Sequence, residues 1–245
     1  MKSVYENAYP EVSAGGFTRV DGTLQFYVRV NALLKPDMHV LDFGAGRGRV
    51  ASSGKPMHAQ LCDLRGKVTR VTGIDVDEAV YENPMLHEAI VFDGGRIPLP
   101  EHSVDLVLSD HVFEHIPDPA HTASELDRVL KPGGWICART PHSLSMVAIA
   151  GRLAPNRFHA RLLRKVQPNQ REDRDVFPTL YRLNTKAALR RYFPSPKWHS
   201  SSYTWNPEPT YNFGSPLVLR AMMLYQFLKS PICGEVLLVF IQKQQ

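Results

Sequence analysis

The chain contains few cysteines and no long hydrophobic run. Its 245 residues include only three cysteines, Cys62, Cys137 and Cys233, which are far apart and form no C-x-x-C pair. This pattern predicts free thiols in a reducing cytoplasm, and no Cys or His spacing typical of a metal site is present. No apolar stretch approaches the ~18 residues of a membrane span, and Met1–Pro10 is polar. We therefore expect neither a transmembrane helix nor a signal peptide.

The positive charge is concentrated in one part of the chain. The net charge is +5, but residues 142–197 hold twelve Lys or Arg against three Asp or Glu, which leaves +9 there and −4 elsewhere. A basic segment of this kind fits either an anionic small molecule or a solvated helical face. Few aromatic residues stand among its arginines, so we do not expect nucleic acid as a partner.

One glycine-rich turn is the most informative feature. It lies in His39–Val50, HVLDFGAGRGRV, where apolar and β-favouring residues lead to Asp42. The turn begins with Gly44, Ala45 and Gly46. A strand that ends in a carboxylate and turns through glycines brings backbone close to a ligand. A dinucleotide-binding fingerprint would need a further glycine where Arg49 stands, which disfavours an NAD-dependent oxidoreductase. An acid at the head of the turn suits a cationic ligand instead.

This D-x-G-x-G-x-G turn resembles motif I of the class I methyltransferases that use S-adenosylmethionine (SAM), in particular the small-molecule type. The resemblance covers roughly residues 23–142 and the final strand, and it includes three further segments. They are VTGIDVD at 71–77, SDHVFEHI at 109–116 and LKPGG at 130–134. It implies SAM as the cofactor, S-adenosylhomocysteine (SAH) as the product, and a SAM-dependent methyltransferase as the enzyme.

The resemblance also implies which residues bind SAM. Asp75 ends a predicted strand, where a carboxylate can accept hydrogen bonds from the ribose hydroxyls. Asp93 and Gly94 follow the next strand and correspond to the family's adenine site. The complete predicted cofactor set is Asp42, Gly44, Ala45, Gly46, Asp75, Val76, Asp93, Gly94 and Ser109.

Two histidines are candidate catalytic bases. His115 and His111 follow the fourth predicted strand, near where methyl donor and acceptor would meet, and an unperturbed histidine has a pKa of about 6.5. The alternative is that each is a loop residue held by hydrogen bonds. We interpret Glu114 between them as structural rather than catalytic.

The acceptor is less well defined by the sequence. The basic insertion at 142–197 is expected to bind the acceptor or act as a lid, and the predicted contact residues are His142, Arg171, Arg174 and Tyr181. They favour O-methylation of a small molecule that is anionic or linked to a glycan or lipid. The apolar helix Pro216–Leu228 could add peripheral contact with the inner face of a membrane, but we favour a cover for the sheet edge.

Two other function classes stay open. The chain could bind SAM without catalysis, as a regulatory or assembly protein. A nucleic-acid or protein methyltransferase is less favoured, because Ser109–Val112 reads SDHV rather than the N-P-P-Y type typical of those enzymes.

The fold expected for residues 1–245 is a single α/β domain. Alternating strands and helices predict a doubly wound, mostly parallel sheet with helices on both faces. The family resemblance implies a Rossmann-like sheet of seven strands in the order 3-2-1-4-5-7-6, with a helical insertion between strands five and six. The predicted strands are Met38–Phe43, Val68–Ile74, Glu88–Phe92, Val104–Leu108, Trp135–Ala138, Trp198–Trp205 and Glu235–Gln242. The predicted helices include Thr23–Leu34, Ser143–Leu153, Phe158–Val166, Thr185–Tyr192, Pro216–Leu228 and one that begins at Pro119. Because Gly54 and Pro56 break helices, we expect a shortened helix after the first strand and an inserted loop across Gly54–Gly66.

Overall fold

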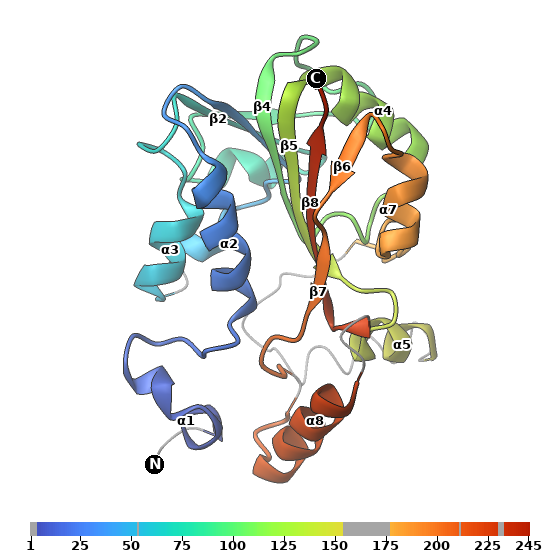
Figure 1. Cartoon of the computed structure of the whole chain (residues 1–245). Helices are drawn as coiled ribbons and strands as arrows, with labels where there is room; N and C mark the ends of the chain where they lie inside the picture. Colours follow the sequence, from blue (N-terminus) through green and yellow to red (C-terminus); the bar gives the residue numbers. More distant parts are fainter. Residues whose placement is uncertain (1–3, 53, 154–176, 211, 230–232) are drawn as a thin grey trace.

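The computed structural model describes residues 4–52, 54–153, 177–210, 212–229 and 233–245. A twisted central sheet runs through the molecule, with helices on both of its faces (Figure 1). The strands are β1 His39–Phe43, β2 Arg70–Asp75, β3 Glu88–Val91, β4 Val104–Asp110, β5 Leu130–Pro141, β6 Trp198–Ser200, β7 Tyr203–Trp205 and β8 Val236–Lys243. The α-helices are α1 Val4–Ala8, α2 Gly22–Leu33, α3 Pro56–Cys62, α4 Pro119–Val129, α5 Met146–Leu153, α7 Lys186–Tyr192 and α8 Pro216–Leu228. Short 3-10 helices are η1 Pro10–Ser13, η2 Arg49–Ser52 and η3 Glu78–Glu82.

The strand order confirms the predicted topology. The described strands follow β3-β2-β1-β4-β5-β8-β6, with β7 also paired to β8. The first five strands are parallel, and β6, β7 and β8 join them by antiparallel pairing. The predicted sixth strand is divided into β6 and β7, which raises the number of described strands from the expected seven to eight. The parallel strands therefore end at one common edge, which we call the carboxyl edge.

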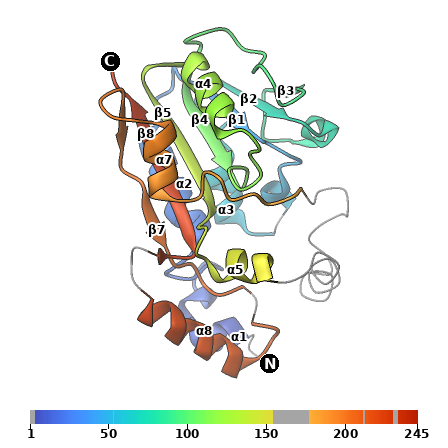
Figure 2. The ribbon, with the colours of Figure 1, turned by 90° about the vertical axis from the view of Figure 1, so that its right-hand side faces the viewer.

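Each face of the sheet has its own apolar core. On one face, Phe26 and Val30 of α2 and Cys62 of α3 pack against the strands. On the other face, Leu126 of α4 and Leu189 of α7 do the same (Figure 2). Burial of a Leu or Phe side chain stabilises the fold by about 1.5–3 kcal/mol, so these two layers hold the carboxyl edge in place.

Two aspartates begin the helices that flank the site. The Asp21 carboxylate accepts hydrogen bonds from the backbone N–H groups of Thr23 and Leu24, and so caps α2. Its second oxygen lies 2.8 Å from Nε2 of His58, which is buried in the first turn of α3. Asp118 caps α4 in the same way. Because α2 and α3 both begin at the carboxyl edge, the contact between Asp21 and His58 ties their first turns together there.

A short helix follows β1 as predicted, but the prediction of a loop across the whole of Gly54–Gly66 is wrong. Residues Pro56–Cys62 form α3, whose first turn contains the proline that we took as a helix breaker. Proline is favoured at the first helical position because the N–H it lacks would have no intrahelical partner there. The fifth strand is longer than the predicted Trp135–Ala138, because β5 already begins at Leu130 and runs through LKPGG with a register shift opposite β4.

The insertion contains the helices expected within its described part. The predicted helices at Ser143–Leu153 and Thr185–Tyr192 correspond to α5 and α7, and Thr185 caps α7. The predicted helix Phe158–Val166 lies outside the described residues.

The helix α8 does not cover the sheet edge, contrary to the interpretation we favoured. It lies beyond the carboxyl edge, where it contacts α1, and α5 stands between it and the sheet (Figure 2). Leu219 is the one buried residue among its described side chains, whereas Leu217, Phe227 and Leu228 are 78%, 85% and 73% exposed. None of the described helices is long and apolar enough to cross a membrane.

The cap of α4 gives a direct test of the fold. Asp118→Ala should lower the free energy of unfolding by about 1 kcal/mol, because the first turn loses its acceptor for the N–H groups of Ala120 and His121. Urea unfolding would measure this difference. Asp118→Asn is the matched control, since asparagine caps helices equally well. An equal loss in both variants would show that the cap is not what stabilises this helix end.

Candidate active site

The glycine-rich turn is fixed to the end of β2. The N–H groups of Gly44 and Ala45 both donate to the carbonyl oxygen of Ile74, at 2.8 and 3.1 Å. The N–H of Gly46 donates to Oδ2 of Asp75 at 2.9 Å. Asn83 braces the other side, where its side-chain amide donates to the carbonyl oxygen of Ala45 at 2.9 Å. These bonds hold a stretch of bare backbone rigidly at the carboxyl edge.

The same turn packs directly against the segment after β4. Gly44 has a φ of +78°, and a Cβ added there would lie 2.3 Å from Cγ2 of Val112. A separation of this size is far below van der Waals contact, so only glycine fits. The turn and the segment that carries His111 and His115 are therefore adjacent, although about 70 residues separate them in the sequence.

Three carboxylates converge below the turn. Burial, followed by the negative charges of Asp110 and Asp75, raises the pKa of Asp42 to about 7. Among the side chains that the structure describes, no cation pairs with Asp42. This carboxyl group thus lacks a compensating positive charge within the described protein.

Asp110 is neutralised by a residue that the sequence analysis missed. Arg139 of β5 binds both carboxylate oxygens of Asp110 at 2.7 Å and donates to Oγ1 of Thr23 at 2.7 Å. The hydroxyl of Tyr27 donates to Asp110 at 3.2 Å. Burial raises the pKa of Asp110, but Arg139 and the other partners outweigh it and leave this pKa below its usual value. The pair ties the ends of β4 and β5 to the start of α2.

The residues expected to meet the ribose and adenine lie together along β2 and β3. Oδ1 of Asp75 accepts a hydrogen bond from the N–H of Asp77 at 3.0 Å, in addition to the bond from Gly46. Val76 is 50% exposed, and a Cβ added at Gly94 would lie 3.7 Å from its Cγ1. Asp93 is exposed and accepts from the N–H of Gly95. An exposed apolar surface with a carboxylate at either end suits a flat purine and its sugar.

The two histidines have different surroundings. His111 is half-exposed and has a φ of +60°, and its N–H donates to the carbonyl oxygen of Arg139 at 2.8 Å. Its Nδ1 lies 3.4 Å from Oε1 of Glu114. His115 is less exposed, and its Nδ1 lies 2.9 Å from the carbonyl oxygen of Pro178. Ser109, just upstream, is fully buried, and its hydroxyl has no hydrogen-bond partner within the described structure.

The residues predicted for the acceptor are only partly described. His142 is 5% exposed, its N–H donates to the carbonyl oxygen of Glu235, and burial followed by the charge of Lys229 lowers its pKa. Tyr181 is half-buried next to the segment that carries the two candidate histidines, and its N–H donates to the carbonyl oxygen of Glu114 at 3.1 Å. Arg171 and Arg174 lie outside the described residues. Their roles stay predictions.

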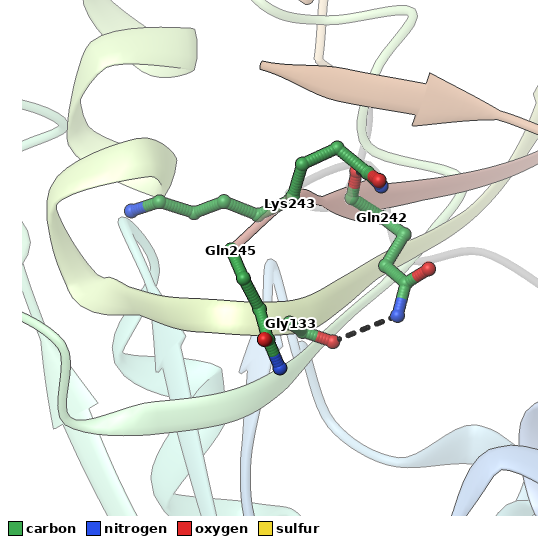
Figure 3. Close-up of a pocket in the computed structure, with 5 residues that line it drawn as sticks. Gly133, Gln242, Lys243 and Gln245 are labelled. Carbon is green, nitrogen blue, oxygen red and sulfur yellow. Dashed lines mark hydrogen bonds between the residues drawn. The ribbon is translucent and has the colours of Figure 1, made fainter. Parts of the chain in front are cut away.

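A hollow at the opposite edge of the sheet is unrelated to this site. It is lined by Gly133 and by the end of the chain, with Gln242 donating to the Gly133 carbonyl oxygen (Figure 3). Its lining is polar and lies where the parallel strands begin. Ligands of open α/β sheets bind at the other end, outside the carboxyl ends of the strands.

Comparison with known families agrees with this geometry. Residues 41–138 match the methyltransferase domain family, a stretch that begins in β1 and ends in β5. Residues 41–138 therefore carry a methyltransferase domain. The match includes the glycine-rich turn, Asp75, Asp93 and both candidate histidines, and it stops just before Arg139.

Two curated relatives are similar to about half of this chain. A Mycolicibacterium smegmatis protein, described as a probable SAM-dependent methyltransferase, is 36% identical over 130 residues, which are 51% of this chain and 46% of that protein. The ubiquinone biosynthesis O-methyltransferase of Albidiferax ferrireducens is 34% identical over 118 residues, or 46% of each chain. The chain thus spans about half the length of the curated relatives it matches.

A solved structure extends the likeness in fold to most of the chain. It is the complex between the Haloferax volcanii Trm112 methyltransferase activator and a methyltransferase, with a TM-score of 0.59 and 16% identity. The likeness covers 91% of this chain and 90% of the other. At this identity the fold is shared, and any acceptor has to be argued from this chain's own residues.

The residues of the site fit SAM, the cofactor that this family implies. SAM carries a sulfonium and an ammonium group, and the site offers Asp42, a carboxylate without a cationic partner among the described side chains. Space at Gly46 is open, since a Cβ added there would have nothing within 4 Å, so a ligand can approach the backbone. When bound, SAM would be held by Asp42, the turn at 44–46, Asp75 and the surface of Val76 and Gly94, and it would supply the methyl group.

Sequence reasoning missed the residues that brace the site. Arg139, Thr140 and Asn83 act through contacts between segments that are distant in the chain. A polar residue near the carboxyl end of a predicted strand was the available signal for Arg139 and Thr140. Asn83 gave none, because an asparagine in a loop is ordinary.

Asp42 should make the unliganded protein less stable at alkaline pH. A carboxyl group whose folded pKa is raised adds stability below its unfolded pKa and loses it as the pH rises toward 7. Asp42→Asn should therefore raise the free energy of unfolding at pH 8 by roughly 2–4 kcal/mol and change it little at pH 4.

Urea unfolding across this pH range would measure the effect of Asp42→Asn. Asp37→Asn, which changes an exposed carboxylate away from the site, is the control. The same Asp42→Asn variant should bind SAM less tightly because a charge partner is lost. A variant that is less stable than wild type at pH 8 would contradict the assigned charge balance.

The contact between Gly44 and Val112 predicts a coupled pair of substitutions. Gly44→Ala should lower stability and weaken SAH binding at least about tenfold, because it adds a clash to the ~1–2 kcal/mol cost of a left-handed alanine. Val112→Ala should recover part of that loss by making room. Calorimetric titration and thermal unfolding of both single variants and the double variant would measure the coupling. Strictly additive effects would show that the two segments do not press on each other.

Proposed function

We propose that this protein is a SAM-dependent enzyme that methylates a hydroxyl oxygen of a small molecule. The observation that carries the proposal is the contact of the SAM turn with the segment that holds His111. In-line transfer from a sulfonium needs donor and acceptor to be close and aligned. A hydroxyl acceptor also needs a base, and either His111 or His115 could take its proton.

The acceptor that we favour has an apolar part, such as a lipid-linked phenol. Phe177, whose ring stands edge-on to His115, and Leu180 are each 40% exposed beside the candidate bases. The apolar face of α8 lies beyond the same edge. The relative from Albidiferax ferrireducens is named as a ubiquinone biosynthesis O-methyltransferase, which supports this class. An anionic or glycan-linked acceptor is supported only by the basic charge of the insertion, and peripheral contact of α8 with a membrane only by its exposed apolar face.

Binding of the cofactor is the first test. Calorimetric titration should give binding of SAM and SAH, and Asp75→Asn should weaken it about 10–100-fold, because that carboxylate both braces Gly46 and faces the predicted ribose site. Glu88→Gln at the amino end of β3 is the control and should bind normally. Tight binding of NAD in place of SAH would overturn the proposal.

The acceptor class requires a matched panel. We would measure the transfer of a labelled methyl group from SAM to four phenols. Two of them carry a prenyl chain and two do not, and one of each pair carries a carboxylate. We expect the prenylated phenols to react fastest. Faster transfer to the unprenylated carboxylates would favour the anionic alternative.

A second candidate function is SAM binding without turnover. It is favoured by the exposed apolar side chains of α8. Large exposed apolar patches are unusual on surfaces that contact only solvent, and they often mark a site where another protein docks. The structure similar in fold from Haloferax volcanii contains a methyltransferase activator. This candidate predicts SAH binding together with no transfer to any member of the panel.

A further inference from the structure

We propose that Glu114 is a positioning residue that orients His111 as the catalytic base, while His115 anchors the segment that follows the insertion. This inference rests on the proposed O-methyl transfer and assigns separate roles to two histidines that the sequence leaves equivalent. It is carried by the contacts of one buried carboxylate.

Among the described residues, only histidines are placed to balance the charge of Glu114. It is 4% exposed, and no lysine or arginine among the described residues forms an ion pair with it. Burial raises its pKa, but His111 and the hydroxyl of Thr140 outweigh burial, so this pKa stays below its usual value. A buried ionised carboxylate with such partners stabilises positive charge on the nearest imidazole.

The two histidines meet this carboxylate differently. Nδ1 of His111 is 3.4 Å from Oε1 of Glu114, whereas Nε2 of His115 is 4.0 Å from it. The other nitrogen of His115 is engaged with the carbonyl oxygen of Pro178 at 2.9 Å. The other nitrogen of His111, Nε2, lies 3.9 Å from Oδ1 of Asp110, a carboxylate that Arg139 already neutralises. Neither Nε2 makes a hydrogen bond among the described residues, but that of His111 stands on the more exposed ring, 46% against 27%, whereas that of His115 has the Glu114 carboxylate as its neighbour.

A buried chain of hydrogen bonds holds Glu114 in place. Its Oε2 accepts from Oγ1 of Thr140 at 2.7 Å, and that hydroxyl accepts from the amide of Asn184 at 2.6 Å. Both residues are fully buried. The carbonyl oxygen of Glu114 also accepts from the N–H of Leu180 at 2.6 Å. The carboxylate is thus fixed by β5 and by the segment before α7, independently of His111.

The backbone of His111 is fixed as well. Its φ of +60° is costly for a residue other than glycine, and the N–H bond to Arg139 maintains it. Strain of this kind persists where surrounding contacts impose it, and it is common at active sites. The ring is thereby presented next to Val112, which touches the SAM turn.

These contacts define the proton path. With Nδ1–H directed at Glu114, Nε2 accepts the proton of the acceptor hydroxyl while its oxygen forms the new bond to the methyl carbon. The bond from that carbon to sulfur breaks and its electron pair stays on sulfur, which leaves SAH, the methyl ether and a protonated His111. The proton then passes to solvent through the exposed side of the ring.

The ring tautomer of His111 tests this assignment without an acceptor. Nitrogen-15 NMR of the histidine rings, assigned with His111→Gln and His115→Gln, should show the Nδ1–H form for His111 in the wild type. Glu114→Gln should shift His111 toward the Nε2–H form and leave SAH binding within about twofold. An unchanged tautomer, or an Nε2–H form already in the wild type, would overturn the proposal.

Two further variants separate positioning from folding. Glu235→Gln alters a second buried glutamate, which pairs with Lys229, and it should lower stability without changing the His111 tautomer. If Glu114→Gln does not fold, Thr140→Val removes the bond that orients the carboxylate and should shift the same tautomer part of the way. No shift in Thr140→Val would then overturn the proposal.

Turnover distinguishes this inference from the proposed function. With the phenol that reacts fastest in the panel, Glu114→Gln should lower kcat about 10–100-fold and leave the KM for SAM within about twofold. A wild type that neither binds SAH nor transfers a methyl group would refute the proposed function. A wild type that is active, with a Glu114→Gln kcat within about twofold of it, would refute only the role of Glu114.

Discussion

The convergence of carboxylates at one edge of the sheet governs the rest of the site. Asp42, Asp75 and Asp110 approach each other because parallel strands end together, and like charges in a partly buried place repel strongly. Arg139 neutralises Asp110 from inside the protein. Asp42 has no such partner among the described side chains, so the unliganded site is electrostatically incomplete. A cationic cofactor supplies the missing positive charge. The free energy that the unliganded protein loses by burying an unpaired Asp42 carboxylate is then recovered when the cofactor binds.

A second constraint links cofactor and acceptor through packing. The absence of a side chain at Gly44 lets Val112 come into contact with the turn, and Val112 follows His111 directly. The Asp110–Arg139 pair also fixes the start of this segment, because the carbonyl oxygen of Arg139 accepts a hydrogen bond from the N–H of His111. A change at either place would move donor and base relative to each other, and displacements of about 1 Å are enough to slow transfer.

The sequence was sufficient for what depends on local pattern. The strand order and the helices α2, α4, α7 and α8 follow from periodicity, capping residues and the family resemblance. It failed where tertiary contacts determine the structure. Pro56 begins a helix that is held by the contact of His58 with Asp21 and by core packing. The helix α8 stays exposed although its sequence is apolar. The residues predicted to bind the cofactor each lie within a single motif, so the local sequence was enough to propose them. Arg139 and Thr140 act across strands. Glu114, which we interpreted as structural, has partners in β5 and in the segment before α7, which are distant in the sequence.

The buried glutamate also bears on the choice of acceptor atom. Replacing a buried ionised group by an apolar one of similar size is often neutral or stabilising, so Glu114 is costly to keep for folding alone. A nitrogen acceptor that is already uncharged needs no base, and the histidine pair would then add nothing to transfer. A hydroxyl acceptor must lose a proton, and a half-exposed histidine whose Nδ1 lies beside a carboxylate has Nε2 left to accept it. The arrangement of Glu114 and His111 therefore supports oxygen over nitrogen as the methylated atom.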